Sequence, residues 1–181
     1  VLFGKNPERF YPTNFVKIGR WEGNNILFHD VEEGNLFTLL RNVTNKLNNN
    51  YLKQKIHFEG LYRIETGEYP REAMREMLLN ALVHRSYMGA PIQIRVYDDK
   101  INIWNDGGLP TGISLESLKR PHSSNPRNPI IAGVCFKGGL IDAWGSGTVK
   151  IIETCLQAEL PEPEFVEQDG GFLVTLFKNN L

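Results

Sequence analysis

The sequence predicts an α/β domain, because segments with helical periodicity are mixed with segments that alternate like strands. Residues 36–47 place apolar side chains at helical spacing, and residues 70–87 form a second candidate helix. Residues 91–105 and 163–178 each hold two alternating runs joined by a short turn, which is typical of β-hairpins. A chain of 181 residues is long enough to bury the core of such a domain.

The remaining segments fit the same mixed pattern. Residues 1–32 are rich in loop-forming residues and contain a candidate strand near Phe15–Trp21. Residues 55–66 alternate well enough to predict a strand. A short helix is expected to end at Gly138–Gly139, and a glycine loop leads into a further helix within residues 145–160.

The composition gives no electrostatic reason to expect nucleic acid or a membrane surface as partner, since 20 basic and 21 acidic residues leave a net charge of -1. Cys135 and Cys155 lack metal-ligand spacing, so we expect reduced core cysteines. The four scattered histidines predict no zinc site. Without a signal peptide or an apolar run near ~20 residues, a cytoplasmic chain with no membrane contact is expected. The start at Val1 indicates a piece of a longer protein.

The second candidate helix carries an unusual polar stripe. Glu76, Asn80 and His84 follow at four-residue spacing, so they fall within roughly 80° of one another around the helix. Apolar residues border the stripe on both sides: Ala73, Met77, Leu79, Ala81 and Val83. A carboxylate and an amide in these surroundings are expected to point inward, where they need polar partners.

Common phosphate-binding motifs are absent from the sequence, which has no GxxxxGK[ST] and no GxGxxG between a strand and a helix. Two glycine pairs remain: Gly107 with Gly108, and Gly145 with Gly147. The second pair precedes a helix, where free backbone N–H groups and the helix dipole favour anionic oxygens. The alternative is that "GSGT" only caps the helix through Ser146 or Thr148.

The order of these pieces resembles a known family. The segments "LNALVHRSY", "IQIRVYDDKINIWNDGGLPTGI", "PRNPIIAGVCFKGGLIDAWGSGTVKI" and "GGFLVTLF" are similar to the C-terminal ATPase-like domain of bacterial RecG-related transcriptional regulators. This likeness covers about residues 68–178. The domain of that family resembles the wider Bergerat-type (GHKL) ATP-binding fold, which gyrase, histidine kinases and MutL share. In addition, "LFGKNPERFYP" resembles the end of a Schlafen/AlbA-type DNA-binding domain.

The resemblance implies a two-layer α/β (α+β) sandwich, in which a mixed, mostly antiparallel sheet carries helices on one face. It implies a division into residues 1–32, as the tail of or linker from a Schlafen/AlbA-type domain, and residues 33–181, as the ATPase-like domain. ATP and Mg²⁺ are the implied ligands. DNA would be contacted through a neighbouring domain, and a homo-oligomer is compatible with the resemblance.

The resemblance also implies roles for the stripe. Asn80 would hold Mg²⁺, since a neutral amide oxygen suits a hard cation beside a triphosphate. Glu76 would orient or deprotonate the attacking water as the catalytic residue. The alternative for Glu76 is a buried carboxylate bonded to backbone or arginine. His84 would contact a phosphate, or else serve as a structural histidine.

The adenine contact has two candidates under the resemblance. If the family glycine is Gly107, the base-binding residue is Asn105; if it is Gly108, the residue is Asp106. Either side chain can accept a hydrogen bond from the adenine amino group. The alternative is a strand that simply ends in an Asn/Asp–Gly turn.

Residues 114–139 correspond to the lid of the ATP-binding fold. This segment is locally basic through Lys119, Arg120, His122, Arg127 and Lys137. Arg127 and Lys137 are the implied phosphate contacts within it, together with Gly145, Gly147 and Thr148 beyond it. A solvated basic loop is the alternative.

We therefore expect a Mg-dependent ATP-binding regulatory domain of a transcriptional regulator, with slow hydrolysis left open. Two other functions stay under consideration. One is a nucleic-acid module in which the lid charges combine with Tyr87, Tyr97 or Trp104. The other is a degenerate ATPase fold that serves dimerisation or domain docking.

Overall fold

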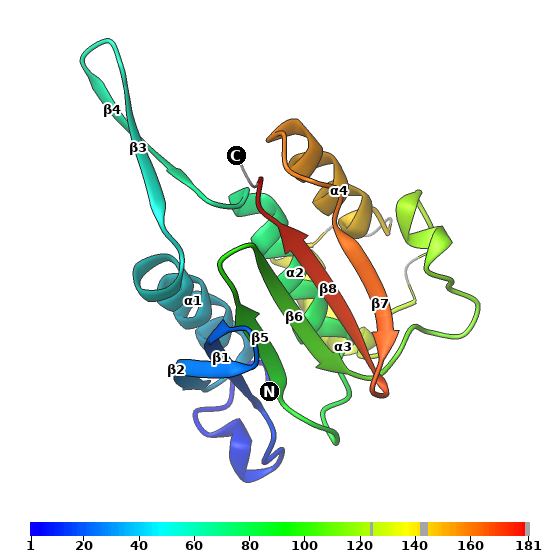
Figure 1. Cartoon of the computed structure of the whole chain (residues 1–181). Helices are drawn as coiled ribbons and strands as arrows, with labels where there is room; N and C mark the ends of the chain where they lie inside the picture. Colours follow the sequence, from blue (N-terminus) through cyan, green and yellow to red (C-terminus); the bar gives the residue numbers. More distant parts are fainter. Residues whose placement is uncertain (124, 142–144, 180–181) are drawn as a thin grey trace.

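The fold is built on a six-stranded open sheet with helices on one face (Figure 1). The computed structural model describes residues 1–123, 125–141 and 145–179. The strands of this sheet are β1 (Phe15–Glu22), β2 (Asn25–Glu33), β5 (Ile92–Val96), β6 (Lys100–Asp106), β7 (Glu164–Gln168) and β8 (Gly171–Phe177). Their order is β2-β1-β5-β6-β8-β7. Only the β1–β5 pair among them is parallel, which confirms the predicted mixed, mostly antiparallel sheet.

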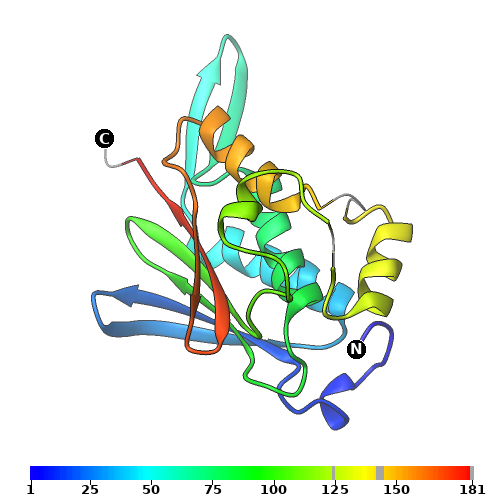
Figure 2. The ribbon, with the colours of Figure 1, turned by 90° about the vertical axis from the view of Figure 1, so that its right-hand side faces the viewer.

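Four α-helices accompany the sheet in the part of the chain that is described. They are α1 (Leu36–Lys46), α2 (Arg71–His84), α3 (Pro129–Lys137) and α4 (Gly147–Gln157). Viewed along the edge of the sheet, they lie on the same side of it (Figure 2). Shorter helical turns occupy η1 (Pro7–Arg9), η2 (Leu47–Tyr51) and η3 (Glu116–Lys119). The two-layer arrangement predicted from the sequence is therefore confirmed.

Local sequence explains where these elements begin and turn. The Asn35 side chain accepts a hydrogen bond from the Thr38 N–H at 3.0 Å and caps α1. Pro70 holds φ at -58° directly before α2, and α2 ends where Arg85 becomes extended. Asp169 and Gly170 have φ of 53° and 72°, which gives the turn between β7 and β8 the twist that a tight hairpin needs.

The core lies between the sheet and the helices. Its sheet side includes Ile18, Ile94, Ile101, Ile103 and Leu176, each at most 1 % exposed. Its helix side includes Leu39, Met77, Leu79, Leu82 and Ile151, which are equally buried. The core therefore fixes α2, which carries the polar stripe, directly against the sheet.

Two parts of the fold differ from the element pattern expected from the sequence. The loop-rich residues 1–32 hold not one strand but most of a hairpin, since β2 follows β1 and forms the edge of the sheet. The single strand expected over residues 55–66 is a separate hairpin of β3 (Gln54–Glu59) and β4 (Tyr62–Gly67). Gly60, with φ of 60°, lies in the two-residue turn that reverses the chain between Glu59 and Tyr62, which pair with each other. The preceding Schlafen/AlbA-type domain stays a prediction.

Candidate functional site

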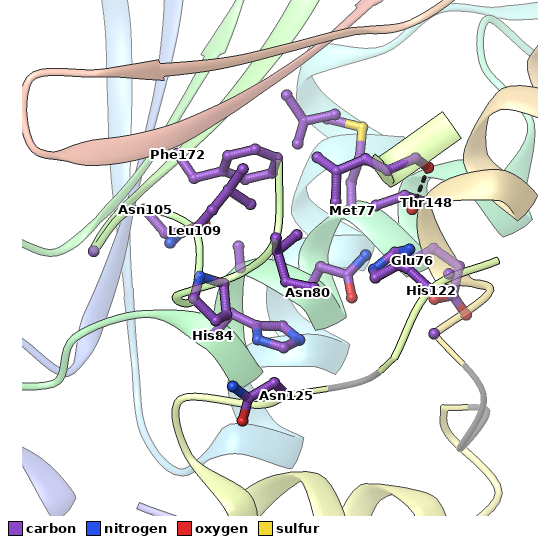
Figure 3. Close-up of a pocket in the computed structure, with 18 of the residues that line it drawn as sticks. Glu76, Met77, Asn80, His84, Asn105, Leu109, His122, Asn125, Thr148 and Phe172 are labelled. Atoms are coloured by element: carbon purple, nitrogen blue, oxygen red, sulfur yellow. Dashed lines mark hydrogen bonds between the residues drawn. The ribbon is translucent and has the colours of Figure 1, made fainter. Parts of the chain in front are cut away.

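A pocket of about 110 Å³ lies between α2, the sheet and the loops that follow β6 and precede α4. Figure 3 shows its side chains. Glu76, Asn80 and His84 of the polar stripe all line this pocket. The inward orientation expected from the helical spacing is therefore what the structure shows. None of the described helices is long and apolar enough to cross a bilayer.

Glu76 is the most buried polar residue of the stripe, at 4 % exposure. Its Oε1 lies 3.7 Å from the Arg75 guanidinium nitrogen Nη1, and the Arg75 side chain itself is 38 % exposed. Arg75 also donates a hydrogen bond of 2.7 Å to the carbonyl of Leu140. The carboxylate thus faces the pocket beside a cation that is anchored to the loop after α3.

The N-terminus of α4 approaches the stripe closely at Gly147. A Cβ atom at this position would lie 2.9 Å from Glu76 Oε2 and 3.5 Å from Asn80 Nδ2. The side chain of Ser146, the N-cap residue of α4, makes no capping hydrogen bond. The first-turn N–H groups therefore keep the capacity to bind an anion next to Glu76 and Asn80.

The Thr148 hydroxyl is occupied within the protein. It donates a hydrogen bond of 2.7 Å to the carbonyl of Leu118, which belongs to η3 in the predicted lid. Thr148 lines the pocket, as do Gly145 and Gly147. The residues of the glycine loop are thus brought together at one end of the pocket, where Thr148 ties the lid to α4.

The other end of the pocket is apolar. Leu109 and Phe172 lie there (Figure 3), and the other apolar side chains that line the pocket include Met77, Ile103 and Val174. Asn105 stands among them at 4 % exposure, and Figure 3 places it beside Leu109 and Phe172. Its Nδ2 donates a hydrogen bond of 3.3 Å to the Asp106 carbonyl. This end of the pocket therefore combines the apolar side chains of Leu109 and Phe172 with the amide group of Asn105.

Of the two candidates for the adenine contact, only Asn105 lines the pocket. Asp106 serves the loop that follows α2. Its Oδ2 accepts a hydrogen bond of 3.0 Å from the Ala90 N–H, and its carbonyl accepts one of 2.8 Å from the Ser86 N–H. The Asp106 side chain also packs against Gly89, where no Cβ would fit.

The lid cations lie mostly outside the pocket. Arg127 is exposed, its guanidinium covers Gly107, and it donates a hydrogen bond of 3.0 Å to the Gly108 carbonyl. Lys119 pairs with Glu162 at 2.6 Å, and Lys137 is exposed at the end of α3. Gly107 and Gly108 do line the pocket. Neither Arg127 nor Lys137 is among the residues that line the pocket.

Sequence reasoning did not anticipate the residues that complete the lid side of the pocket, Ser123 and Asn125, nor the apolar pair Leu109 and Phe172. His122, expected only as a lid charge, also lines the pocket. No local pattern marks these positions. The one available signal was the pairing of two predicted hairpin strands, which sets Phe172 opposite Asn105.

His84 is neutral at pH 7. Burial lowers its pKa to about 4, and the nearby charges of Arg127 and His122 act in the same direction. A neutral imidazole can donate or accept a hydrogen bond but supplies no positive charge to a phosphate. Among the described residues, no group of three or more His, Cys, Asp or Glu side chains could hold a metal ion.

A mixed, mostly antiparallel sheet with helices on one face, and a pocket between α2 and the sheet, is consistent with an ATPase-like α/β fold. Residues 89–176 match the family model described as "Putative ATP-dependent DNA helicase recG C-terminal". This match confirms the resemblance found in the sequence over these residues. It spans β5 to β8, so α2 with Glu76, Asn80 and His84 precedes the matched residues.

A solved structure shows the same fold over nearly the whole chain. The crystal structure of the DIP2311 protein from Corynebacterium diphtheriae is similar to 91% of this chain, with 26% sequence identity and a TM-score of 0.77. The similarity covers 34% of that protein, so this chain spans about a third of its length. No curated protein matches the chain.

Proposed function

We propose that the pocket binds ATP together with Mg²⁺ and that the domain regulates a RecG-related transcriptional regulator. One observation carries the proposal. The N-terminus of α4, where the Ser146 side chain makes no capping hydrogen bond, packs through Gly147 against Glu76 and Asn80, at the end of the pocket opposite Asn105 and Phe172. An anion-binding helix end and an apolar base-sized end thus share one cavity.

The residues at the polar end fit a magnesium–triphosphate group. Mg²⁺ takes oxygen ligands and keeps several waters, so the Asn80 amide oxygen could be its single protein ligand beside phosphate oxygens. Gly145, Gly147 and Thr148 would offer backbone N–H groups to the phosphates. When bound, the cation would neutralise developing charge on the phosphates. A methyl group at position 147 would intrude on this end.

Glu76 is the residue suited to activate water. Its carboxylate is buried, lines the pocket and lies next to Asn80 on the same face of α2. A positioned carboxylate can accept a proton from an attacking water, which general-base catalysis requires. Slow hydrolysis is thus included in the proposal, with Glu76 as the base.

The apolar end suits the adenine ring. Met77, Leu109 and Phe172 would cover the faces of the base, and the amide of Asn105 would pair with its edge. The Asp106 carboxylate is engaged with the Ala90 N–H, so we assign the base contact to Asn105.

ATP entry requires the lid to move outward. Ligand pockets usually enclose roughly 300–1,000 Å³, whereas this cavity measures about 110 Å³. In the described residues between β6 and α3, the short turn η3 is the one regular element, and its Leu118 carbonyl is hydrogen-bonded to Thr148 of α4. Breaking that hydrogen bond would let the lid open. Contacts with DNA are assigned to a neighbouring domain of a longer protein.

Thermal denaturation with nucleotide tests the proposal. ATP with Mg²⁺ should raise the melting temperature, because a ligand bound only by the folded state stabilises it by about 2.7 kcal/mol at 100 times Kd. ADP, GTP and ATP without Mg²⁺ are the comparisons, and Asn80→Ala should abolish the benefit of Mg²⁺. An unchanged melting temperature at millimolar ATP would contradict ATP binding and favour a fold kept for docking.

A further inference from the structure

The β3–β4 hairpin projects from the body of the domain in both views (Figures 1 and 2). It forms a separate two-stranded sheet. Four large apolar residues on it are half or more exposed: Ile56 at 52 %, Phe58 at 69 %, Leu61 at 98 % and Tyr62 at 79 %. A lone two-stranded hairpin is marginally stable in water, so an arm of this composition needs a partner surface.

A groove of about 530 Å³ lies at the base of the same arm, between α1 and the start of α2. Its apolar lining includes Leu40, Leu52 and Met74, which are only partly buried. The arm residues Gln54 and Gly67 form part of its edge. The tip of the arm points away from α1 and α2, which line this groove, so the arm does not fill the groove of its own chain (Figures 1 and 2).

We propose that this groove receives the arm of a second copy of the chain, so that two copies clasp each other reciprocally. Six residues per strand give the arm a length of about 20 Å. Cross-strand pairing puts Phe58 and Tyr62 on opposite faces of the arm, on either side of the tip residue Leu61. If two arms lie antiparallel, the tip of each falls at the base of the other, where a groove can cover both faces of the tip. Arm and groove are neighbours on every copy, so one twofold axis satisfies both contacts and closes the assembly.

The exposed area is sufficient for such a dimer. Four side chains of this size and exposure present on the order of 400–500 Å² per copy. With a matching area from each groove, the two contacts together bury about 1,600–2,000 Å², which is the size of a standard stable interface. A one-sided contact with an unrelated protein would leave the other arm or the other groove uncovered.

Sedimentation equilibrium of the whole chain tests the clasp. The chain should form a dimer at about 50 µM, within reach of an interface of this size. Phe58→Ser with Leu61→Ser should raise the dimer dissociation constant at least tenfold and leave the melting temperature of the monomer unchanged. Met88→Ser is the matched control, since Met88 is 85 % exposed and belongs neither to the arm nor to the lining of the groove. A monomeric parent chain, or a dimer insensitive to the arm variant, would overturn the proposal.

Chemical cross-linking distinguishes the clasp from other dimers. A chain with Leu61→Cys mixed with a chain carrying Asn48→Cys, at the exposed rim of the groove, should form a mixed dimer with a short bismaleimide. The native Cys135 and Cys155 are fully buried and should not react. Cross-linking of Leu61→Cys to itself, without the mixed product, would indicate tip-to-tip contact and refute the clasp.

Discussion

Helix α2 and the lid that follows β6 contribute opposite kinds of structure to one pocket. In α2, Leu79 and Leu82 are fully buried in the core, so Glu76 and Asn80 are held in fixed positions. Apart from the turn η3, the described lid residues before α3 are irregular, and contacts such as the hydrogen bond from Thr148 to Leu118 hold them in place. The comparison indicates that chemistry resides on the rigid helix, whereas access depends on the lid.

The largest expected effect concerns the rigid helix. Glu76→Gln keeps the shape of the side chain but removes the proton acceptor, so ATP turnover should fall by roughly 10²–10⁴-fold. Single-turnover hydrolysis with labelled ATP measures it. The thermal shift with ATP and Mg²⁺ should persist in this variant. Unchanged turnover would reduce Glu76 to a core carboxylate beside Arg75.

The next effect concerns His84, at the C-terminal end of the same stripe. Its folded pKa of about 4 lies below the ordinary value of 6.5, so only the unfolded state binds a proton between these values. His84 therefore contributes stability that is fully present above pH 6.5 and is lost as the pH falls toward 4, up to about 3 kcal/mol.

Denaturant unfolding between pH 4 and 7 checks the His84 prediction. The free energy of unfolding of the parent chain should fall on acidification, and His84→Gln should lose most of that dependence. If the free energy of unfolding depends on pH equally in the parent chain and in His84→Gln, the His84 side chain is solvated and the prediction is wrong.

A third prediction tests the contact between α4 and the stripe. Gly147→Ala should destabilise the fold by about 1–2 kcal/mol, because its Cβ would meet the buried Glu76 carboxylate at 2.9 Å. It should also reduce the thermal shift with ATP. Gly133→Ala on α3 is the matched control, since nothing lies within 4 Å of its Cβ and alanine favours the helix. Equal effects at the two glycines would contradict close packing at position 147.

The sequence predicts those features that depend on residues close together in the chain. The stripe on α2 and the β5–β6 and β7–β8 hairpins rest on short periods and turns, and all three are present. Edge strand β2 has most residues exposed on both faces, so it lacks the alternation that would mark it. The apolar end of the pocket depends on Phe172 lying opposite Asn105, a contact between residues far apart in the chain. Local patterns cannot supply such contacts.

The smallest effect concerns the lid. Thr148→Val removes the hydroxyl that donates to the Leu118 carbonyl at 2.7 Å and keeps the volume of the side chain. Loss of one such hydrogen bond costs about 1 kcal/mol. If ATP entry requires this bond to break, the lid opens more readily in the variant, and the association rate should rise about fivefold. Stopped-flow binding of a fluorescent ATP analogue measures the rate. Thr154→Val is the matched control, because its hydroxyl bonds only within α4. An association rate that is unchanged in Thr148→Val, despite lower stability, would show that the lid opens elsewhere.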